Sequence, residues 1–248
     1  MSENTIPAVE KTLELIALIG NSPVPLSRKV LEGKLALSSS TCYRILCTLQ
    51  EADWIRKLPE GTFILSTGLV SATRNLFELT AKYECMQEYL DRLSAETGLS
   101  SKFSIRRGDY QITLLRGESD SRFQISGKIG ADFPLIEGSV GAALLSGESE
   151  KNLENLIRRC PEKIEERSNP QLVRNRIRTL KKEGAALNMT PNRWHIHAMS
   201  APVRGPEGKT EAALTLLGWE GDFEGPRLAE LRTVLLKYAE LCARRLSI

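Results

Sequence analysis

The sequence has few of the residues from which metal centres, disulfide frameworks and membrane spans are built. Of its 248 residues two are histidine and five are cysteine, and no two cysteines have CxxC spacing. This pattern excludes a zinc ribbon and a disulfide framework, and it favours free thiols in a reducing compartment. No apolar run approaches the roughly 20 residues that span a bilayer, and the first residues lack the basic start and apolar core of a signal peptide. We therefore expect a cytoplasmic protein with no membrane partner.

Sequence motifs of the common enzyme classes are missing as well. There is no HExxH zinc motif, no GxSxG nucleophile motif and no P-loop, because the GKTE at 208–211 lacks the upstream glycines. His195 and His197 share one face of an expected strand, but no recognisable third ligand accompanies them, so we expect no metal site and no cofactor. A basic run in a later helix is expected to be a solvated face rather than a second nucleic-acid site: Arg174, Arg176, Arg178, Lys181 and Lys182.

The charge of the chain is nearly balanced overall but locally basic near its start. A net charge of +3 gives little support to nucleic-acid binding by the whole chain. However, six of the seven basic residues among positions 1–66 fall between Arg28 and Lys57, where only three acidic residues stand. A patch of this size can anchor a small DNA-binding module.

The most informative stretch is LSSSTCYRILCTL, residues 37–49. Cys42, Ile45, Leu46 and Leu49 stand at i, i+3, i+4 and i+7, the stripe that an amphipathic helix buries. The opposite face carries short hydroxyls, a tyrosine and an arginine, and such a face suits close approach to DNA. A capped core helix with a polar outer face is the competing interpretation. The residues expected to contact DNA are Ser38, Ser39, Ser40, Thr41, Tyr43 and Arg44, with Arg28, Arg56 and Lys57 beside them.

Residues 1–66 are predicted to form three helices followed by a two-stranded hairpin. A helix from Pro7 to Ile19, a short helix that Ser27 caps, and the hydroxyl-bearing helix precede the strands WIRKL and TFIL. This order is a winged helix-turn-helix, whose second motif helix enters the major groove. The first helix is apolar on more than one face, which predicts a second packed surface such as a dimer interface.

These segments resemble the N-terminal domain of IclR-type bacterial transcription regulators. The resemblance rests on IPAVEKTLELIALI, LSSSTCYRILCTLQEADWIRK and GTFILSTGL. Ser40, Thr41 and Arg44 match the Ser-Thr-x-x-Arg pattern of the family's recognition helix, whereas Ser39 replaces a common lysine and Ala36 replaces a turn glycine. The resemblance implies sequence-specific binding of double-stranded DNA by a homodimer, and a dimer of dimers is common in the family.

The chain beyond residue 66 is expected to comprise a linker helix at 67–83 and a second domain at 84–248. Apolar residues from Leu69 to Leu93 recur at spacings of three and four, which indicates one long helix or two in line, with a break near Tyr83 to Cys85. Separate blocks of strands and helices then predict an α+β domain with a mainly antiparallel sheet. The expected elements are strands at 101–107, 110–117, 122–130, 194–204 and 211–219, and helices near 137–147, 150–159, 171–183 and 227–246.

This second half resembles the GAF-like effector-binding domain of the same family, through GADFPLIEGSVGAALLS and MSAPVRGPEGKTEAALTLLG. The resemblance implies a small-molecule effector, of unknown identity, in a pocket near Ile129, Gly130, Ser139, Val140, Ala198, Met199, Ser200, Thr215 and Leu217. The family's His, Thr and Lys at the loop-helix start have become Ile136, Gly138 and Ala142 here. Loss of these polar groups predicts an effector larger or more apolar than a small carboxylate, or none.

The sequence thus favours an IclR-like regulator whose operator binding is modulated by a small molecule. Two alternatives stay open, a divergent enzyme and an interaction scaffold that has kept the fold but lost its ligand.

Overall fold

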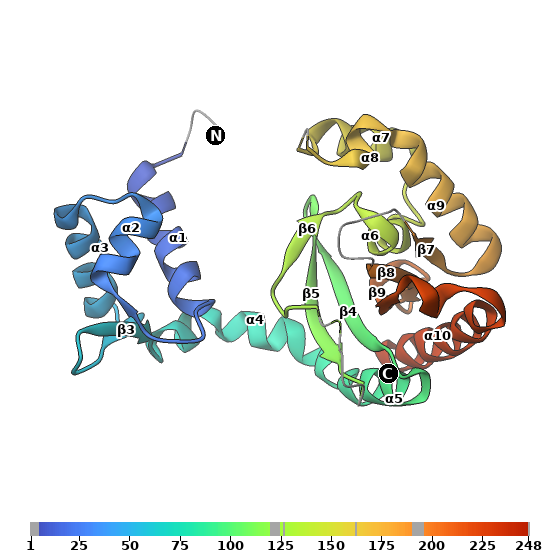
Figure 1. Ribbon diagram of the computed structural model, residues 1–248, viewed down its shortest axis with the longest axis horizontal. Coiled ribbons are helices and arrows are strands. Elements are labelled where there is room, and N and C mark those ends of the chain that lie inside the picture. The colour runs from blue at the N-terminus through green and yellow to red at the C-terminus, as the bar shows by residue number, and fades with distance from the viewer. Residues whose placement is uncertain (1–4, 120–124, 126, 162, 190–195, 248) are drawn as a thin grey trace. The chain divides into compact units, whose positions relative to one another are not determined.

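The structure is a computed structural model that describes residues 5–119, 125, 127–161, 163–189 and 196–247 (Figure 1). The chain divides into two compact units, Met1–Thr80 and Ala81–Ile248. Within the described residues, no helix is both long and apolar enough to cross a membrane.

The first unit is a winged helix-turn-helix. Its strands pair in the order β1-β3-β2, and both pairings are antiparallel. The predicted order of three helices and a wing is confirmed, but the sequence does not predict β1, because a strand of two residues has no periodicity to read. The elements are α1 (Pro7–Gly20), β1 (Leu26–Ser27), α2 (Arg28–Leu35), α3 (Ser39–Glu51), β2 (Ile55–Lys57) and β3 (Thr62–Leu65).

The apolar stripe of α3 forms part of the core of this unit. Cys42, Ile45, Leu46 and Leu49 are all buried, as their spacing predicts. Because they fix which side of α3 faces inward, the hydroxyl-bearing face is left outside. Their neighbours in the core come from α1, α2 and the small sheet: Leu15, Ile19, Leu26, Leu31, Ile55 and Phe63.

The turn between α2 and α3 contains a strained residue. Ala36 has φ 51° and ψ 43°, the left-handed conformation that glycine adopts readily. For a residue with a Cβ this conformation costs about 1–2 kcal/mol. Alanine at this turn is therefore tolerated but unfavourable, which is the physical reason why glycine suits the position.

Two helices follow the wing, α4 (Gly68–Glu84) and α5 (Gln87–Thr97). They are separated at Cys85 and Met86, at the edge of the predicted break. Gly68 begins α4 so close to the end of α3 that an added Cβ would lie 2.4 Å from the Asp53 carbonyl oxygen. The later part of the predicted apolar seam is buried in the core of the second unit, where its members are Tyr83, Met86, Leu90 and Leu93. The side chains of residues 75–80 lie outside the described part of the structure.

The second unit is built on a six-stranded antiparallel sheet, which confirms the predicted α+β class. The strands lie in the order β6-β5-β4-β9-β8-β7, so β4 and β9 are central. Their bounds are β4 (Ser100–Arg107), β5 (Tyr110–Gly117), β6 (Asp132–Pro134), β7 (Ala186–Asn188), β8 (Ile196–Arg204) and β9 (Thr210–Trp219).

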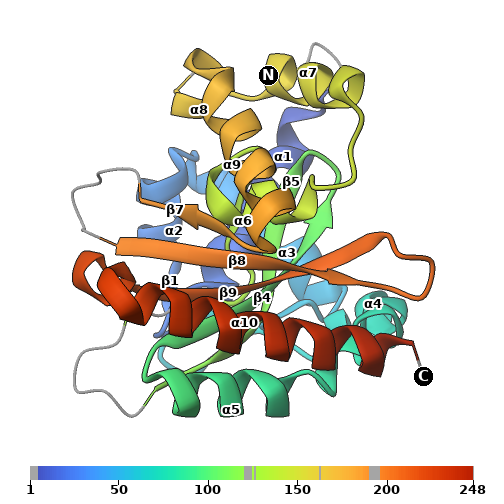
Figure 2. The same ribbon diagram turned by 90° about the vertical axis from the view of Figure 1, so that its right-hand side faces the viewer.

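Helices cover both faces of this sheet (Figure 2). One face carries α5 and α10 (Gly225–Leu246), and the other carries α6 (Gly138–Leu144), α7 (Glu150–Arg159), α8 (Glu165–Ser168) and α9 (Pro170–Glu183). Successive residues of a strand point to opposite faces. Met199 and Ala201 of β8 accordingly lie in the core with α5 and α10, whereas Ser200 contacts Ser139 of α6.

Two parts of this unit differ from the sequence-based expectation. The strand expected at 122–130 falls partly outside the described residues, and its described positions are loop and turn, so the strand β6 comes later, at 132–134. The sequence also misses α8 and β7, because elements of three or four residues are too short to show a period.

Candidate functional site

The N-terminus of α3 is organised by Ser38. Its Oγ accepts a hydrogen bond from the Thr41 N–H (3.2 Å) and donates one to Thr41 Oγ1 (2.8 Å). The Ser40 Oγ lies 3.1 Å from the Ser38 Oγ. One hydroxyl therefore caps the helix, while Ser39, Ser40 and Thr41 remain exposed at its first turn.

The outer face of α3 continues with Tyr43 and Arg44, which are both exposed. A side-chain hydrogen bond with Cys47 raises the pKa of Tyr43, so the phenol stays protonated and keeps its donor. Arg44 makes no ion pair with any residue that the structure describes. Its guanidinium is thus available for a phosphate or for the edge of a guanine.

The other basic residues predicted to contact DNA lie on two further elements of the first unit. Arg56 and Lys57 are exposed on the wing strand β2, and neither has an ion-pair partner among the described residues. Arg28 begins α2 and is paired with Glu32, with 3.1 Å between Arg28 Nε and Glu32 Oε1. Arg28 would have to exchange this partner to hold a phosphate, unlike the wing residues.

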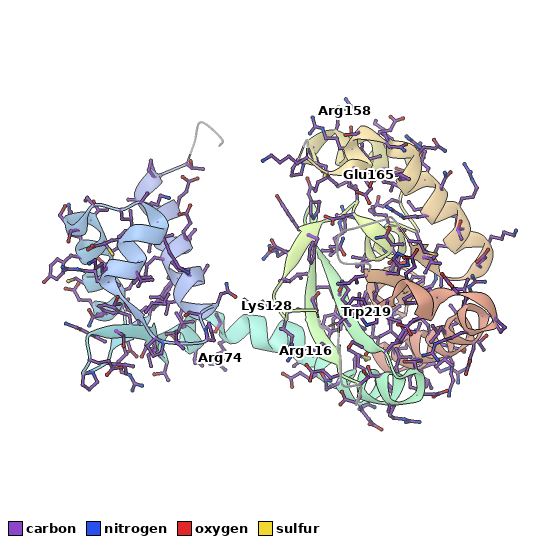
Figure 3. The ribbon with its side chains drawn as sticks, in the orientation of Figure 1. Arg74, Arg116, Lys128, Arg158, Glu165 and Trp219 are labelled. Carbon is purple, nitrogen blue, oxygen red and sulfur yellow. The ribbon has the colours of Figure 1, made fainter. Side chains whose placement is uncertain are left out.

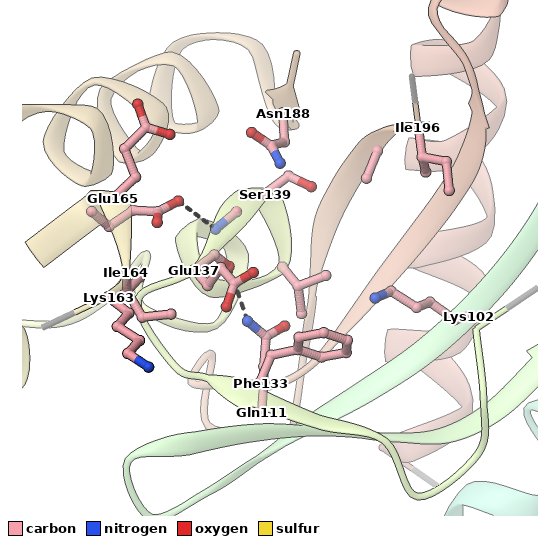
Figure 4. A pocket seen from close by; sticks show the side chains of 14 residues that line it. Lys102, Gln111, Phe133, Glu137, Ser139, Lys163, Ile164, Glu165, Asn188 and Ile196 are labelled. Atoms are coloured by element: carbon pink, nitrogen blue, oxygen red, sulfur yellow. Dashed lines mark hydrogen bonds between the residues drawn. The ribbon is translucent and has the colours of Figure 1, made fainter. Parts of the chain in front are cut away.

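A cavity of about 610 Å³ opens in the second unit between the sheet and α6 (Figure 4). Its walls come from β4, β5, β6, the start of α6, the segment before α8, the start of α8, β7 and β8. The lining residues are Lys102, Gln111, Phe133, Glu137, Gly138, Ser139, Val140, Lys163, Ile164, Glu165, Glu166, Asn188, Ile196 and Ala198. Five of these carry charge, namely Lys102, Glu137, Lys163, Glu165 and Glu166, and the sequence did not predict them.

A buried ion pair supports one wall of the cavity. Glu166 and Arg176 are both buried, and the Arg176 guanidinium donates hydrogen bonds to the Glu166 carboxylate and to Asn188 Oδ1 (2.9 Å). Glu166 also accepts from the Gly138 N–H (3.1 Å) at the start of α6. Arg176 therefore points into the protein, and the expectation of a fully solvated basic face on α9 is wrong at this position.

The loop before α6 is held from the sheet side by Gln111. Its Nε2 donates to the carbonyl oxygens of Pro134 (3.0 Å) and Glu137 (2.9 Å). Together with the Gly138–Glu166 bond, these contacts fix the backbone from which Glu137 and Ser139 face the cavity (Figure 4).

Two ionisable groups of the cavity have shifted pKa values. Burial lowers the pKa of Lys102 to about 8, although the Glu137 carboxylate opposes this shift. Burial, and then the charge of Glu166, raises the pKa of Glu137. Lys163 and Glu165 are exposed at the rim instead.

Five of the residues predicted to bind the effector lie in or directly behind the cavity. Ser139, Val140 and Ala198 line it. Ser200 and Thr215 are fully buried behind Ser139, in a chain of hydroxyls with 2.9 Å between Ser139 Oγ and Ser200 Oγ and 2.9 Å between Ser200 Oγ and Thr215 Oγ1. This chain fixes the orientation of the Ser139 hydroxyl from behind.

The other four predicted residues are not brought to this cavity. Met199 faces the core on the opposite side of β8, because adjacent strand residues alternate. Leu217 lines a smaller cavity of about 110 Å³ near Trp219. Ile129 is 53% exposed, and Gly130 adopts φ 79° in a turn outside the lining.

Sequence reasoning missed the residues that give the cavity its charge and its support, namely Lys102, Gln111, Glu137, Glu166 and Asn188. One signal was available, because Lys102 alternates with fully buried Phe103 in a central strand, where a lysine is unusual. Of the histidine pair, His195 lies outside the described residues, and His197 is buried next to Phe223. The described part of the chain holds no group of three or more side chains placed to bind a metal.

Comparisons with known proteins agree with this architecture. Residues 81–244 match the family model of the bacterial transcriptional regulator IclR C-terminal domain. The HTH-type transcriptional regulator XynR of Escherichia coli K12 is 23% identical in an alignment 237 residues long that covers 93% of this chain and 93% of XynR.

Solved structures share the fold over nearly the whole length. An IclR transcriptional regulator from Alicyclobacillus acidocaldarius is 19% identical, with a TM-score of 0.74 and coverage of 98% of this chain and 100% of that chain. An IclR homologue from Microbacterium hydrocarbonoxydans, complexed with 4-hydroxybenzoate, is 14% identical, with a TM-score of 0.77 and coverage of 96% and 98%.

These matches favour a regulator over a divergent enzyme or a ligand-free scaffold. The chain belongs to the IclR family of bacterial transcriptional regulators.

Proposed function

We propose that the chain binds operator DNA through the outer face of α3, and that a small molecule in the cavity beside α6 modulates this binding. The observation that carries the DNA-binding part is the composition of that face. Short hydroxyls, Tyr43 and Arg44 lie outward, and Arg44 has no ion-pair partner in the part of the chain that the structure describes. The apolar stripe is buried. Short side chains let the helix backbone approach the base edges closely, and Arg44 is long enough to read a guanine.

The residues of this interface divide into different roles. Ser38 caps α3, so its contribution is mainly to position the helix. Ser39, Ser40, Thr41 and Tyr43 supply hydrogen bonds to phosphates or bases. Arg56 and Lys57 of the wing hold the flanking phosphates, and Arg28 joins them by leaving Glu32.

The proposed effector site is the cavity of about 610 Å³, large enough for a metabolite of ordinary size. The complex of the IclR homologue with 4-hydroxybenzoate supports small-molecule binding by a protein of this fold. In this chain Ser139, Val140 and Ala198 would touch the ligand, and Ser200 and Thr215 would orient Ser139.

We further propose a division of labour along the chain and a homodimer. Residues 1–66 would bind DNA, 67–83 would link the domains and 84–248 would bind the effector. A dimer would bind a two-fold symmetric operator, and two such dimers would associate into a dimer of dimers, which is common in the family. The protein would act in the cytoplasm, where its DNA target lies.

Selection of binding sites from random DNA duplexes tests the proposal. We expect an enriched, two-fold symmetric sequence with the unaltered protein. Arg44→Ala should weaken binding by about 1–3 kcal/mol and relax the preference at one position of each half-site. Arg158→Ala, an exposed arginine on α7 (Figure 3), is the matched control and should bind like the unaltered protein. Failure to enrich any sequence, at low and at moderate salt, would overturn the proposal.

A further inference from the structure

The cavity beside α6 holds two charged groups of opposite sign, Lys102 and Glu137, and neither side chain makes a hydrogen bond or an ion pair with a residue that the structure describes. Lys102 extends from β4 into the cavity, and its Nζ lies 5.7 Å from the centre of the Phe133 ring (Figure 4). Among the described residues, its ammonium makes no hydrogen bond or ion pair. The same holds for the Glu137 carboxylate, which does not cap α6 although Glu137 is its N-cap residue.

The other charged residues that line the cavity in the described part of the chain make no hydrogen bond or ion pair with these two groups. Glu166 is already engaged by Arg176 and by the Gly138 N–H. Lys163 and Glu165 are exposed at the rim, where water solvates them. Lys102 and Glu137 therefore face the cavity without a hydrogen-bonding partner among the described residues.

Both residues are half-buried, and leaving such groups without a hydrogen-bonding partner is unfavourable, because burial removes part of their water without replacing its hydrogen bonds. The directions of their pKa shifts agree with this, since burial lowers the pKa of Lys102 to about 8 and raises the pKa of Glu137. A ligand that touched both groups would restore both sets of lost interactions at once.

Resting on the proposed effector function of this cavity, we propose that the effector is a small amino-acid-like zwitterion. Its acidic group binds the Lys102 ammonium, and its ammonium group binds the Glu137 carboxylate. A ligand with only an acidic group would satisfy Lys102 but would leave Glu137 unpaired and add a second negative charge beside it. A ligand with only an amine would pair with Glu137, but it would leave Lys102 unpaired and add a second positive charge beside it.

The test measures binding of matched compounds to the full chain by calorimetry and by thermal shift. The zwitterions are the L-α-amino acids and the series glycine, β-alanine, γ-aminobutyrate and δ-aminovalerate, which varies the separation of the charges. Each is compared with the acid that lacks the amine and with the amine that lacks the acid. We expect at least one zwitterion to bind, and to bind about tenfold or more tightly than either matched compound, since a hydrogen bond to a charged group is worth that much.

Two substitutions connect the preference to the two residues. Lys102→Met should weaken binding of that zwitterion by about 10- to 100-fold. Glu137→Gln should weaken it similarly and should remove its advantage over the matched acid. Lys209→Met and Glu207→Gln are the controls, since these side chains are 80% and 76% exposed in the β8–β9 turn, and neither should change binding.

The outcomes separate this inference from the proposed function. A matched acid that binds as tightly as every zwitterion, or a panel in which no zwitterion binds at millimolar concentration, overturns the inference even if a variant fails to fold. Operator binding is measured in the same samples. If a zwitterion binds but leaves operator affinity unchanged, the inference about the ligand stands and the proposed control of DNA binding fails. If only the matched acid changes operator affinity, the proposed control of DNA binding stands and the inference about the ligand fails.

Discussion

The surroundings of Lys102 disfavour the protonated, positively charged form of its side chain. It lies in the central strand β4, between the buried Ser101 and Phe103, and it faces the cavity. Burial lowers its pKa from 10.5 to about 8. Because the unfolded chain restores the ordinary value, this lysine makes the stability of the second unit depend on pH.

The direction of that dependence follows from the proton balance. Between pH 8 and 10.5 the unfolded chain binds more protons at Lys102 than the folded protein does, so the free energy of unfolding rises with pH across this window. At pH 7 Lys102 is protonated in both states, so the full cost of burying its charge lowers the free energy of unfolding. Lys102→Met should therefore stabilise the ligand-free protein at pH 7 by about 1–3 kcal/mol, with little gain at pH 10.

Urea unfolding at the two pH values measures this difference. Lys209→Met is the control, because Lys209 is exposed and should change stability equally little at both. A Lys102→Met variant that is no more stable than the unaltered protein at pH 7 would contradict the prediction.

At the scale of one element, α3 contains residues that stabilise the helix and other residues that are available to contact DNA. Ser38 accepts the Thr41 N–H and so belongs to the first group, whereas Arg44 makes no ion pair with any described residue and belongs to the second. Stability and DNA affinity should therefore respond to different substitutions in the same helix.

Ser38→Ala should lower the free energy of unfolding of the first unit by about 0.5–2 kcal/mol, because the cap is lost. Ser38→Asn keeps a capping oxygen and should retain most of the stability. Thermal unfolding of both variants, beside Arg44→Ala, checks this assignment. Equal stability of Ser38→Ala and Ser38→Asn, with equal loss of DNA binding, would make Ser38 a contact residue instead.

At the scale of the whole molecule, α1 carries an apolar stripe that the first unit does not bury. Ile6, Val9 and Leu13 are 66%, 51% and 59% exposed, and they follow one another at helical spacing. By contrast Leu15 and Ile19 of the same helix are buried in the core. We therefore expect this exposed apolar stripe to be the surface that pairs two copies of the chain.

Val9→Ser combined with Leu13→Ser should convert a dimer into a monomer and weaken operator binding, while the unit keeps its helical circular dichroism spectrum because both side chains are exposed. Sedimentation at micromolar concentration measures the oligomeric state. Val24→Ser is the control, since Val24 is 61% exposed in the same unit but outside α1. An unaltered protein that is monomeric at that concentration would contradict the prediction.

Local patterns in the sequence were sufficient for most elements. The spacing of Cys42, Ile45, Leu46 and Leu49 determined which face of α3 is buried, and Gly184 ended α9 in the left-handed conformation that glycine favours. Such features depend only on neighbours within one or two turns, so they can be read without knowing the fold. The resemblance to the IclR family then supplied the order of the domains.

Only the tertiary structure decided what the cavity contains. Lys102, Glu137 and Ala198 come from different elements, and strand pairing and helix packing bring them together. The same packing placed Met199 on the wrong face of β8 for the cavity and turned Arg176 of a basic run inward to meet Glu166. Periodicity specifies which residues of an element share a face. What that face meets depends on register and packing between distant segments, which no local pattern records.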